Sequence, residues 1–524
     1  MRVVALPLIC LCAVTAASAQ SARNWRPEDR VLIGDWTNVV AVASAPERVF
    51  IVSPDAILSW SPLLRRWDGP FEPAVPGSLA RVSAGMIDPL DNSLWLVTPD
   101  GWVHFQPDLQ FWERGTAGAQ LLDFAFDLAA PFDGLFLRTS AGWSRLPRGA
   151  LAPIPSRGPV RPVRPATVDQ ALAANPALRG TASAFLLDPA LRNARLTAAA
   201  RSYDNLGWYL GTDGVGALFL ADGTVVPQRL TFGLPGRSVG AIHAVPGGIW
   251  AITDEGANEL ASLVFVTGDL NEFRVFTGPA ATGLPFSQGR RLLGVGSSLW
   301  AATDAGVVRF PEADPANFTL YAEADGLPDR RVASLASRHG VVVAATARGL
   351  ARFADTTEAE PLAPEYAGSV RAVAIEGDTV WAGTPSGPRV AVGDVRRLVQ
   401  PFSVGESASL QVTIFDFAWM ADTLVALTSD QLLWKVPGVD DWRLGAPISG
   451  LVGSLRRLIT DGDGFWVAGA LGVGWTRLDG MPVRPLLVDS DLPGPPLDLA
   501  VDADFLWVAT TGGLVRFRRA EVLP

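Results

Sequence analysis

Side chains that could do acid–base chemistry or bind a metal ion are few in this sequence. Three histidines, His104, His243 and His339, are spread over 524 residues. Each falls in or beside a different expected β-strand, and a metal site would need them to converge with carboxylates. We interpret them as lying on surfaces or strand edges. The sequence therefore predicts no catalytic residue, no metal ligand and no cofactor site.

Residues 461–464 read Asp-Gly-Asp-Gly, which resembles a fragment of a calcium-binding loop. The remaining spaced ligands and the terminal Glu of such a loop are missing. Asp502 and Asp504 occupy the same place before a later tryptophan-bearing segment. We therefore expect a turn that precedes a β-strand, and not an ion site.

Tryptophan is abundant, with 18 residues. Aromatic platforms for a sugar are one interpretation, and its candidates are Trp102, Trp112, Trp143 and Trp419. Core packing is the other interpretation, and we expect it for most tryptophans, including Trp67 and Trp442 in outer strands. No Gly-rich phosphate loop, nucleophile elbow or HExxH sequence is present.

Residues 1–19 have the features of a signal peptide, namely a basic start, an apolar run and an Ala-Ser-Ala cleavage site. The alternative is a lipoprotein anchor on Cys10 or Cys12, but Ile9 and Leu11 precede these cysteines where a small residue is needed. Both cysteines lie in this leader, so the mature chain has no thiol and no disulfide. We expect export to the periplasm or the extracellular space.

The net charge of -10 disfavours nucleic acid and anionic membrane surfaces as partners. No later stretch has the 18 or more uninterrupted apolar residues of a membrane-spanning helix. The sequence therefore predicts no membrane insertion.

One pattern recurs along the chain, and its clearest copies are LWAATDAGVVRF at 299–310 and LWVATTGGLVRF at 506–517. We expect the tryptophan segment to be a strand buried on both faces. The Thr-Asp-x-Gly stretch predicts a hairpin turn, with Gly at positive φ. The tryptophan position recurs at 50, 95, 136, 208, 250, 300, 342, 381, 425, 466 and 507, where Phe50, Phe136, Val342 and Val425 replace the aromatic ring.

Most of these positions are 39 to 50 residues apart, with one gap of 72. A period of about 40–45 residues is typical of the four-stranded blade of a β-propeller. The sequence therefore predicts an all-β fold with about eleven or twelve four-stranded blades. Rings usually hold about four to eight blades, so we expect two rings of five to seven blades. A blade completed by both ends of the chain remains an alternative.

A Gly-Leu-Pro turn precedes several of these strand pairs, at 233–235, 283–285 and 326–328, with a variant at 491–493. We expect it to link the outer strand of one blade to the inner strand of the next. Together these segments resemble the two-component-regulator propeller repeat. That resemblance implies a sensor-type propeller outside the cytoplasm, usually built as paired seven-bladed rings. No transmembrane, kinase or DNA-binding region follows the last repeat, so the resemblance implies fold and location and leaves the signalling role open.

The 72-residue gap coincides with a Pro- and Arg-rich stretch at 147–165, which suggests an extended linker. Thr167 and Gln170 then predict a capped helix. We divide the chain into a leader (1–19), N-terminal blades (20–146), an insertion (147–200) and further blades (201–524). The insertion is either a surface excursion between blades or an arm that docks a partner.

The function that we expect is that of a non-catalytic scaffold. Its loop faces would bind a glycan, a peptide or an envelope protein. The alternative is a polysaccharide lyase or hydrolase with its site at the channel mouth. A third hypothesis is a structural component of an assembly, with the 147–200 insertion as the contact.

Overall fold

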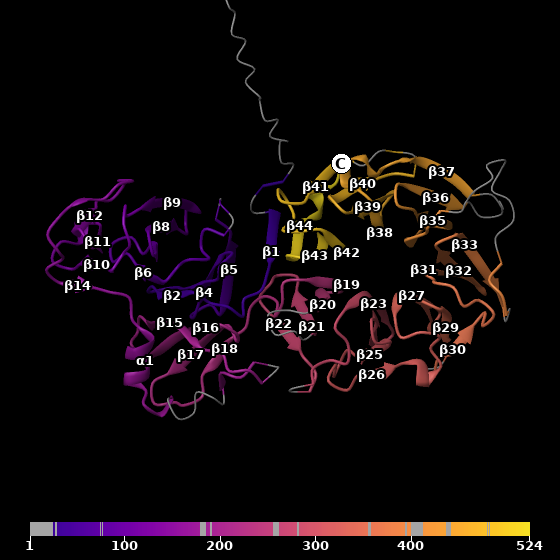
Figure 1. Ribbon diagram of the computed structural model, residues 1–524, viewed down its shortest axis with the longest axis horizontal. Helices are drawn as coiled ribbons and strands as arrows, with labels where there is room; N and C mark the ends of the chain where they lie inside the picture. The colour runs from indigo at the N-terminus through magenta and orange to yellow at the C-terminus, as the bar shows by residue number, and fades with distance from the viewer. Residues whose placement is uncertain are drawn as a thin grey trace, which may run out of the picture.

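The computed structural model describes residues 25–524, except 27–28, 74, 76, 179–184, 189–190, 255–260, 280–281, 355–357, 394–395, 400–411, 436–441, 479 and 481–482. The described residues form eleven antiparallel sheets, nearly all of four strands. Figure 1 shows that the sheets are divided between a ring and a smaller set beside it. The all-β propeller prediction is confirmed.

Seven sheets surround one axis and make the ring, and we number them as ring blades 1 to 7. Blades 1 to 3 consist of β19 (Val239–Val245), β20 (Gly248–Thr253), β21 (Ser262–Thr267) and β22 (Phe273–Phe276); β23 (Gly289–Val295), β24 (Ser298–Thr303), β25 (Val307–Pro311) and β26 (Thr319–Tyr321); and β27 (Val332–Arg338), β28 (Val341–Thr346), β29 (Gly349–Phe353) and β30 (Glu360–Leu362).

Blades 4 to 6 consist of β31 (Ala372–Glu376), β32 (Thr379–Thr384) and β33 (Gly387–Val392); β34 (Asp416–Met420), β35 (Thr423–Leu427), β36 (Gln431–Lys435) and β37 (Trp442–Pro447); and β38 (Leu455–Asp461), β39 (Gly464–Gly469), β40 (Gly472–Thr476) and β41 (Val483–Leu487). The short helix α3 (Ser449–Val452) joins blades 5 and 6. The first strand of each blade lies nearest the axis (Figure 1).

Both ends of the described chain build ring blade 7. It contains β42 (Pro496–Val501), β43 (Phe505–Thr510) and β44 (Gly513–Arg518), and β1 (Arg30–Ile33) forms its outer strand. β1 pairs antiparallel with β44, in a register that places Ile33 opposite Leu514. Both side chains are fully buried, and β42 packs against β19 of blade 1. The N-terminal strand therefore completes the blade that closes the ring.

The other four sheets lie between β1 and β19 in the chain, and we number them as arc blades 1 to 4. They consist of β2 (Ala41–Ser44), β3 (Val49–Val52), β4 (Ile57–Ser61) and β5 (Arg66–Phe71); β6 (Ala84–Ile87), β7 (Leu94–Thr98), β8 (Gly101–Gln106) and β9 (Phe111–Thr116); β10 (Asp123–Asp127), β11 (Leu135–Thr139), β12 (Gly142–Leu146), β13 (Ile154–Pro155) and β14 (Pro162–Val163); and β15 (Leu196–Arg201), β16 (Gly207–Thr212), β17 (Ala217–Ala221) and β18 (Gln228–Leu230).

These four blades form an arc in the order 3, 2, 1, 4. β2 packs against both β6 and β15, and arc blades 2 and 3 share a core. In the described part of the chain, no core cluster joins arc blade 3 to arc blade 4. The sheets thus divide into sets of seven and four, instead of two sets of five to seven.

The Pro- and Arg-rich stretch forms part of arc blade 3. β13 pairs with β12 and β14 pairs with β10, so the stretch borders both edges of that sheet. Helix α1 (Val168–Ala174) follows with the predicted capping box between Thr167 and Gln170. Ala171 of this helix packs in the core of arc blade 4. The segment thus covers the two terminal blades of the arc, as capping elements do in repeat proteins.

The repeat has the local structure that its residues predict. Thr303 Oγ1 donates a hydrogen bond to the carbonyl of Gly306 (2.7 Å) and accepts one from the Ala305 N–H. Gly306 has a φ of +143°, and a Cβ there would lie 2.2 Å from the Tyr321 carbonyl oxygen. The turn therefore requires glycine, and Thr346, Thr384 and Thr510 make the same bond.

Two of the predicted tryptophan-position residues are wrong by one place. In ring blade 3, Ser334 pairs with Ala345, as Arg291 pairs with Ala302 in ring blade 2. Trp300 lies two residues before Ala302, so the equivalent residue of ring blade 3 is Val343, two residues before Ala345, and not Val342. By the same comparison Tyr209 replaces Trp208 in arc blade 4. A β-branched run and an adjacent aromatic pair look alike in either register, which explains the error. The Gly-Leu-Pro segments link consecutive blades as predicted.

Candidate functional site

One histidine lies in an arrangement that resembles a catalytic triad. His104 Nε2 is 2.8 Å from Ser93 Oγ, and His104 Nδ1 is 2.9 Å from Glu113 Oε2. However, the Ser93 hydroxyl donates its proton to Asp91 Oδ1 at 2.6 Å. His104 therefore does not accept that proton, as the base of a catalytic triad would. Ser93 is 2% exposed and His104 6% exposed. We conclude that this group cross-links β8, β9 and the preceding turn, and the expectation that His104 lies on a surface is wrong.

The other two histidines lie in ring blades 1 and 3, so the three do not converge. His243 is on β19, where burial and Arg291 lower its pKa, and it is therefore neutral at pH 7. His339 is exposed in the turn between β27 and β28. Among the described residues, no three His, Cys, Asp or Glu side chains gather as a metal site would require.

Four charged residues meet near the axis of the ring, and we call them the axial layer. They are Arg291 of β23, Asp416 of β34, Arg457 of β38 and Asp498 of β42. Each pairs with an equivalent position of the second strand of its blade, so all four lie at one level. Ala241, Ser334 and Ala372 occupy this level in the other three blades.

Single arginine side chains connect distant blades at this level. Arg291 lies 3.5 Å from Asp416 and 3.6 Å from Asp498. Arg457 lies 3.4 Å from Asp498 and donates to the Leu497 carbonyl. Because the arginines reach blades 5 and 7 from blades 2 and 6, the axial layer crosses the channel.

The two carboxylates of the axial layer also accept backbone hydrogen bonds from the next blade. The Ile242 N–H donates to Asp498, and the Leu458 N–H donates to Asp416, each at 3.1 Å. Burial raises the pKa of Asp498, although Arg457 and Arg291 oppose this shift. Burial lowers the pKa of Arg291, but Asp416 and Asp498 outweigh it and hold that pKa above its ordinary value. The layer is therefore a buried, ion-paired network.

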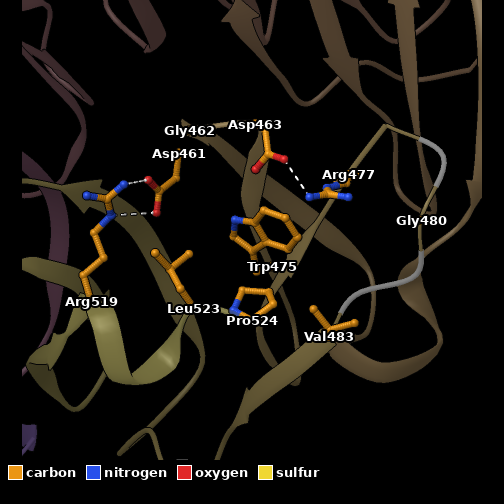
Figure 2. Close-up of a pocket in the computed structure, with 10 residues that line it drawn as sticks. All are labelled: Asp461, Gly462, Asp463, Trp475, Arg477, Gly480, Val483, Arg519, Leu523 and Pro524. Atoms are coloured by element: carbon orange, nitrogen blue, oxygen red, sulfur yellow. Dashed lines mark hydrogen bonds and ion pairs between the residues drawn. The ribbon is translucent and has the colours of Figure 1, made fainter.

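A pocket of about 730 Å³ lies between ring blade 6 and the C-terminal helix α4 (Arg519–Val522), and we call it the C-terminal pocket. Its volume is within the range of roughly 300–1,000 Å³ typical of ligand sites. Figure 2 shows its lining. The lining residues are Asp461, Gly462, Asp463, Trp475, Arg477, Gly480, Val483, Arg519, Leu523 and Pro524.

Two ion pairs flank this pocket, and they differ in burial (Figure 2). Arg519 holds Asp461, whose side chain is only 2% exposed and also accepts a bond from the Trp466 Nε1–H. This pair is structural, and its hydrogen bond raises the pKa of Arg519. Arg477 pairs with Asp463 at 2.6 Å, with both side chains more than half exposed.

The Arg477 guanidinium also lies over the Trp475 ring, 5.6 Å from its centroid. Exposed ion pairs contribute about 0–1 kcal/mol to stability, so such a pair can exchange partners at little cost. The pocket thus offers an aromatic wall, an apolar wall from Leu523 and Pro524, and one exchangeable pair. A second, smaller cavity of about 290 Å³ lies beside Glu365 and Arg397.

The Asp-Gly-Asp-Gly segment is the turn between β38 and β39, as predicted. Its aspartates contribute to the C-terminal pocket, which sequence reasoning missed because Arg477 and Arg519 are distant in the chain. Among the proposed sugar platforms, Trp102 is 1% exposed and belongs to a core. Trp112, Trp143 and Trp419 are half-buried. Trp67 and Trp442 are buried in outer strands, as expected.

No family model matches the sequence, and no curated relative does either. Solved structures are similar in fold. The extracellular domain of a hybrid two-component system from B. thetaiotaomicron is 12% identical, with a TM-score of 0.43, over 92% of this chain and 70% of that chain. PorZ, a surface component of the type-IX secretion system of Porphyromonas gingivalis, is 14% identical, with a TM-score of 0.46, over 92% and 69%.

A virginiamycin B lyase structure from Staphylococcus aureus is 11% identical, with a TM-score of 0.44, over 54% of this chain and 95% of that chain. None of the helices in the described part of the chain is long and apolar enough to cross a membrane.

Proposed function

We propose that the protein is an exported, non-catalytic scaffold that binds a ligand in the C-terminal pocket. The observation that carries this proposal is the contrast between two kinds of polar group. In the axial layer the charged side chains pair among themselves. In the separate Ser93–His104–Glu113 group the polar side chains are likewise hydrogen-bonded to one another. The Arg477–Asp463 pair is exposed beside a pocket of ligand size.

The lining of the pocket fits a glycan or a short peptide. Leu523 and Pro524 supply apolar contact area for a ring or an aliphatic side chain, and Trp475, which is 8% exposed, borders it. Arg477 supplies a planar donor for a hydroxyl or carboxylate, and Asp463 an acceptor. An envelope protein would present the same groups on a loop.

The enzymatic alternative places a glycan-cleaving site at the channel mouth. Such a site needs two carboxylates, or a histidine with a tyrosine and an arginine, that are free to exchange protons. Asp416 and Asp498 instead each accept a backbone N–H and contact an arginine. The geometry of the axial layer therefore favours a structural role for these carboxylates.

Export is also part of the proposal. The leader at 1–19 lies outside the described residues, and its basic start, apolar run and Ala-Ser-Ala site support export to the periplasm or the extracellular space. The described residues of the 147–200 insertion pack in arc blades 3 and 4, which favours a structural role for it over that of a partner-docking arm.

Arg477→Ala is expected to weaken ligand binding roughly ten- to hundredfold while leaving the thermal midpoint of unfolding unchanged. One charge-assisted hydrogen bond is worth about 1.5–3 kcal/mol, and the exposed ion pair adds little to stability. Labelled protein on a glycan array identifies the ligand, and calorimetric titration then gives the affinity of the wild type and the variant.

Arg201→Ala is the matched control. Arg201 pairs with Asp222 at 2.6 Å and lies over the Trp208 ring, 5.3 Å from its centroid. It reproduces the Arg–Asp–Trp chemistry on arc blade 4, away from the C-terminal pocket. Equal affinities of wild type and Arg477→Ala would contradict the proposal, and cleavage of the bound glycan would establish the enzymatic alternative.

A further inference from the structure

In each of the seven ring blades, one residue directly precedes the level of the axial layer. These seven residues lie at the end of the channel where the innermost strands begin. We call these seven positions the rim. They are occupied by Gly240, Arg290, Ala333, Arg371, Phe415, Arg456 and Leu497. The three arginines thus belong to ring blades 2, 4 and 6. The C-terminal pocket lies where β38 ends, at the opposite end of the ring.

The three rim arginines have no counter-charge. Among the described residues, no carboxylate lies within ion-pair distance of Arg290, Arg371 or Arg456, although many other arginines have such a partner. Arg371 and Arg456 are exposed and Arg290 is half-buried. In a protein with a net charge of -10, three unpaired cations at equivalent positions form a local field of opposite sign.

The channel is narrow where these arginines stand. Arg457 of blade 6 donates a hydrogen bond to the carbonyl of Arg290 in blade 2, so one side chain reaches across the channel. The Arg371 guanidinium lies 5.3 Å from the ring centroid of Phe415, the rim residue of the next blade. One arginine side chain thus spans the channel directly below the rim.

The axial layer forms the floor beneath the rim. The two levels contribute five arginines (290, 291, 371, 456 and 457) and two aspartates (416 and 498). Two further carboxylates lie at this end, Asp254 beside the rim position Gly240 and Asp304 beside the segment that leads to Arg290, so the net charge is +1 by 5 − 4. Asp254 and Asp304 follow the second strands of blades 1 and 2. Their carboxylates accept backbone N–H bonds from Gly289, Ser287 and Gln288.

We propose that the rim binds a small ligand that carries two or three clustered oxyanion groups. Guanidinium groups bind carboxylate, sulfate and phosphate through paired N–H donors. Three of them around a closed floor favour clustered charges over a single one. The ligand is thus a sulfated, phosphorylated or uronate-type small molecule. This site is separate from the C-terminal pocket and does not depend on the function proposed for it.

The test is calorimetric titration of the whole mature chain with three probes: inositol hexakisphosphate, a heparin-derived tetrasaccharide and a tetragalacturonate. The arms distinguish phosphate, sulfate and carboxylate as the source of charge. The variant is Arg290→Gln/Arg371→Gln/Arg456→Gln. The control is Arg65→Gln/Arg114→Gln/Arg443→Gln, which removes the same charge from exposed sites away from the rim.

We expect at least one probe to bind the wild type and the control equally, and to bind the rim variant at least about a hundredfold more weakly. Melting curves of all three proteins check the fold, and each single rim variant repeats the measurement if the triple variant is unstable. Failure of every probe to bind at millimolar concentration would overturn the proposal. So would an equal loss of binding in the rim variant and the control, which indicates non-specific attraction.

Discussion

Replacement of Asp498 by alanine is expected to destabilise the ring by about 3–5 kcal/mol, because it leaves Arg457 without a carboxylate partner and Arg291 with Asp416 alone. Asp498 is 1% exposed and contacts Arg291 and Arg457 of two other blades. It also accepts the Ile242 N–H of blade 1. The substitution therefore removes the side chain that links ring blade 7 to ring blades 1, 2 and 6 near the axis. Urea unfolding monitored by tryptophan fluorescence measures the loss.

Ser334→Ala serves as the matched control, because Ser334 holds the same level in ring blade 3 and is equally buried. We expect it to change the free energy of unfolding by less than about 1 kcal/mol. Asp498→Asn keeps an oxygen that can accept the backbone N–H but loses the charge, and its effect should lie between the two. If the free energies of unfolding of Asp498→Ala and Ser334→Ala differ by less than about 1 kcal/mol, the axial layer does not stabilise the ring.

Phe232→Ala is expected to separate the unfolding of the arc from that of the ring. Phe232 lies where the chain returns from the arc, and it is 7% exposed. Its ring centroid is 5.2 Å from that of Trp67 in the arc and 4.6 Å from that of Phe273 in the ring. Trp36 of the outgoing segment packs edge-on against it. One side chain thus joins the aromatic groups of both parts.

Truncation of a buried phenylalanine costs about 3–5 kcal/mol. Because this cost falls at the junction, we expect scanning calorimetry to show two resolved transitions instead of one coupled transition. Phe132→Ala is the control, since Phe132 is 78% exposed on arc blade 3. An unchanged thermogram for Phe232→Ala would mean that the junction does not couple the two parts.

Much of the blade structure follows from short-range sequence. The hydroxyl of Thr303, the positive φ of Gly306 and the burial of Trp300 depend on neighbours within a few residues or on the adjacent strand. The threonine–glycine turn repeats in ring blades 2, 3, 4 and 7, so one copy predicts the others. The capped helix after Thr167 was predictable for the same local reason.

The axial layer was not predicted, although the sequence contains a signal for it. Arg291, Asp416, Arg457 and Asp498 each precede the tryptophan position of their blade by nine residues. That common offset places them at one level only if their blades share a ring. The sequence leaves the ring boundary open, because the arc is inserted between β1 and β19.

Contacts that follow no repeating pattern account for the remaining differences. His104 becomes buried because Ser93 and Glu113 flank it on a hairpin and an adjacent strand. The C-terminal pocket depends on the position of α4 beside blade 6, which no repeat encodes. The Pro- and Arg-rich stretch looked like a linker because its two short strands lack alternation, yet they pair with β10 and β12.

Amide hydrogen exchange along β44 tests most directly whether the N-terminal strand closes the ring. Leu32→Pro places a residue without an N–H in β1, opposite Val515, while Leu63→Pro alters an exposed turn in the arc. If the ring closes through β1, the amides of Gly513–Arg518 lose protection from exchange in Leu32→Pro and keep it in Leu63→Pro. The amides of ring blade 2 stay protected in both variants. Equal protection of β44 in all three proteins would show that blade 7 is complete without β1, and the account of the ring would be wrong.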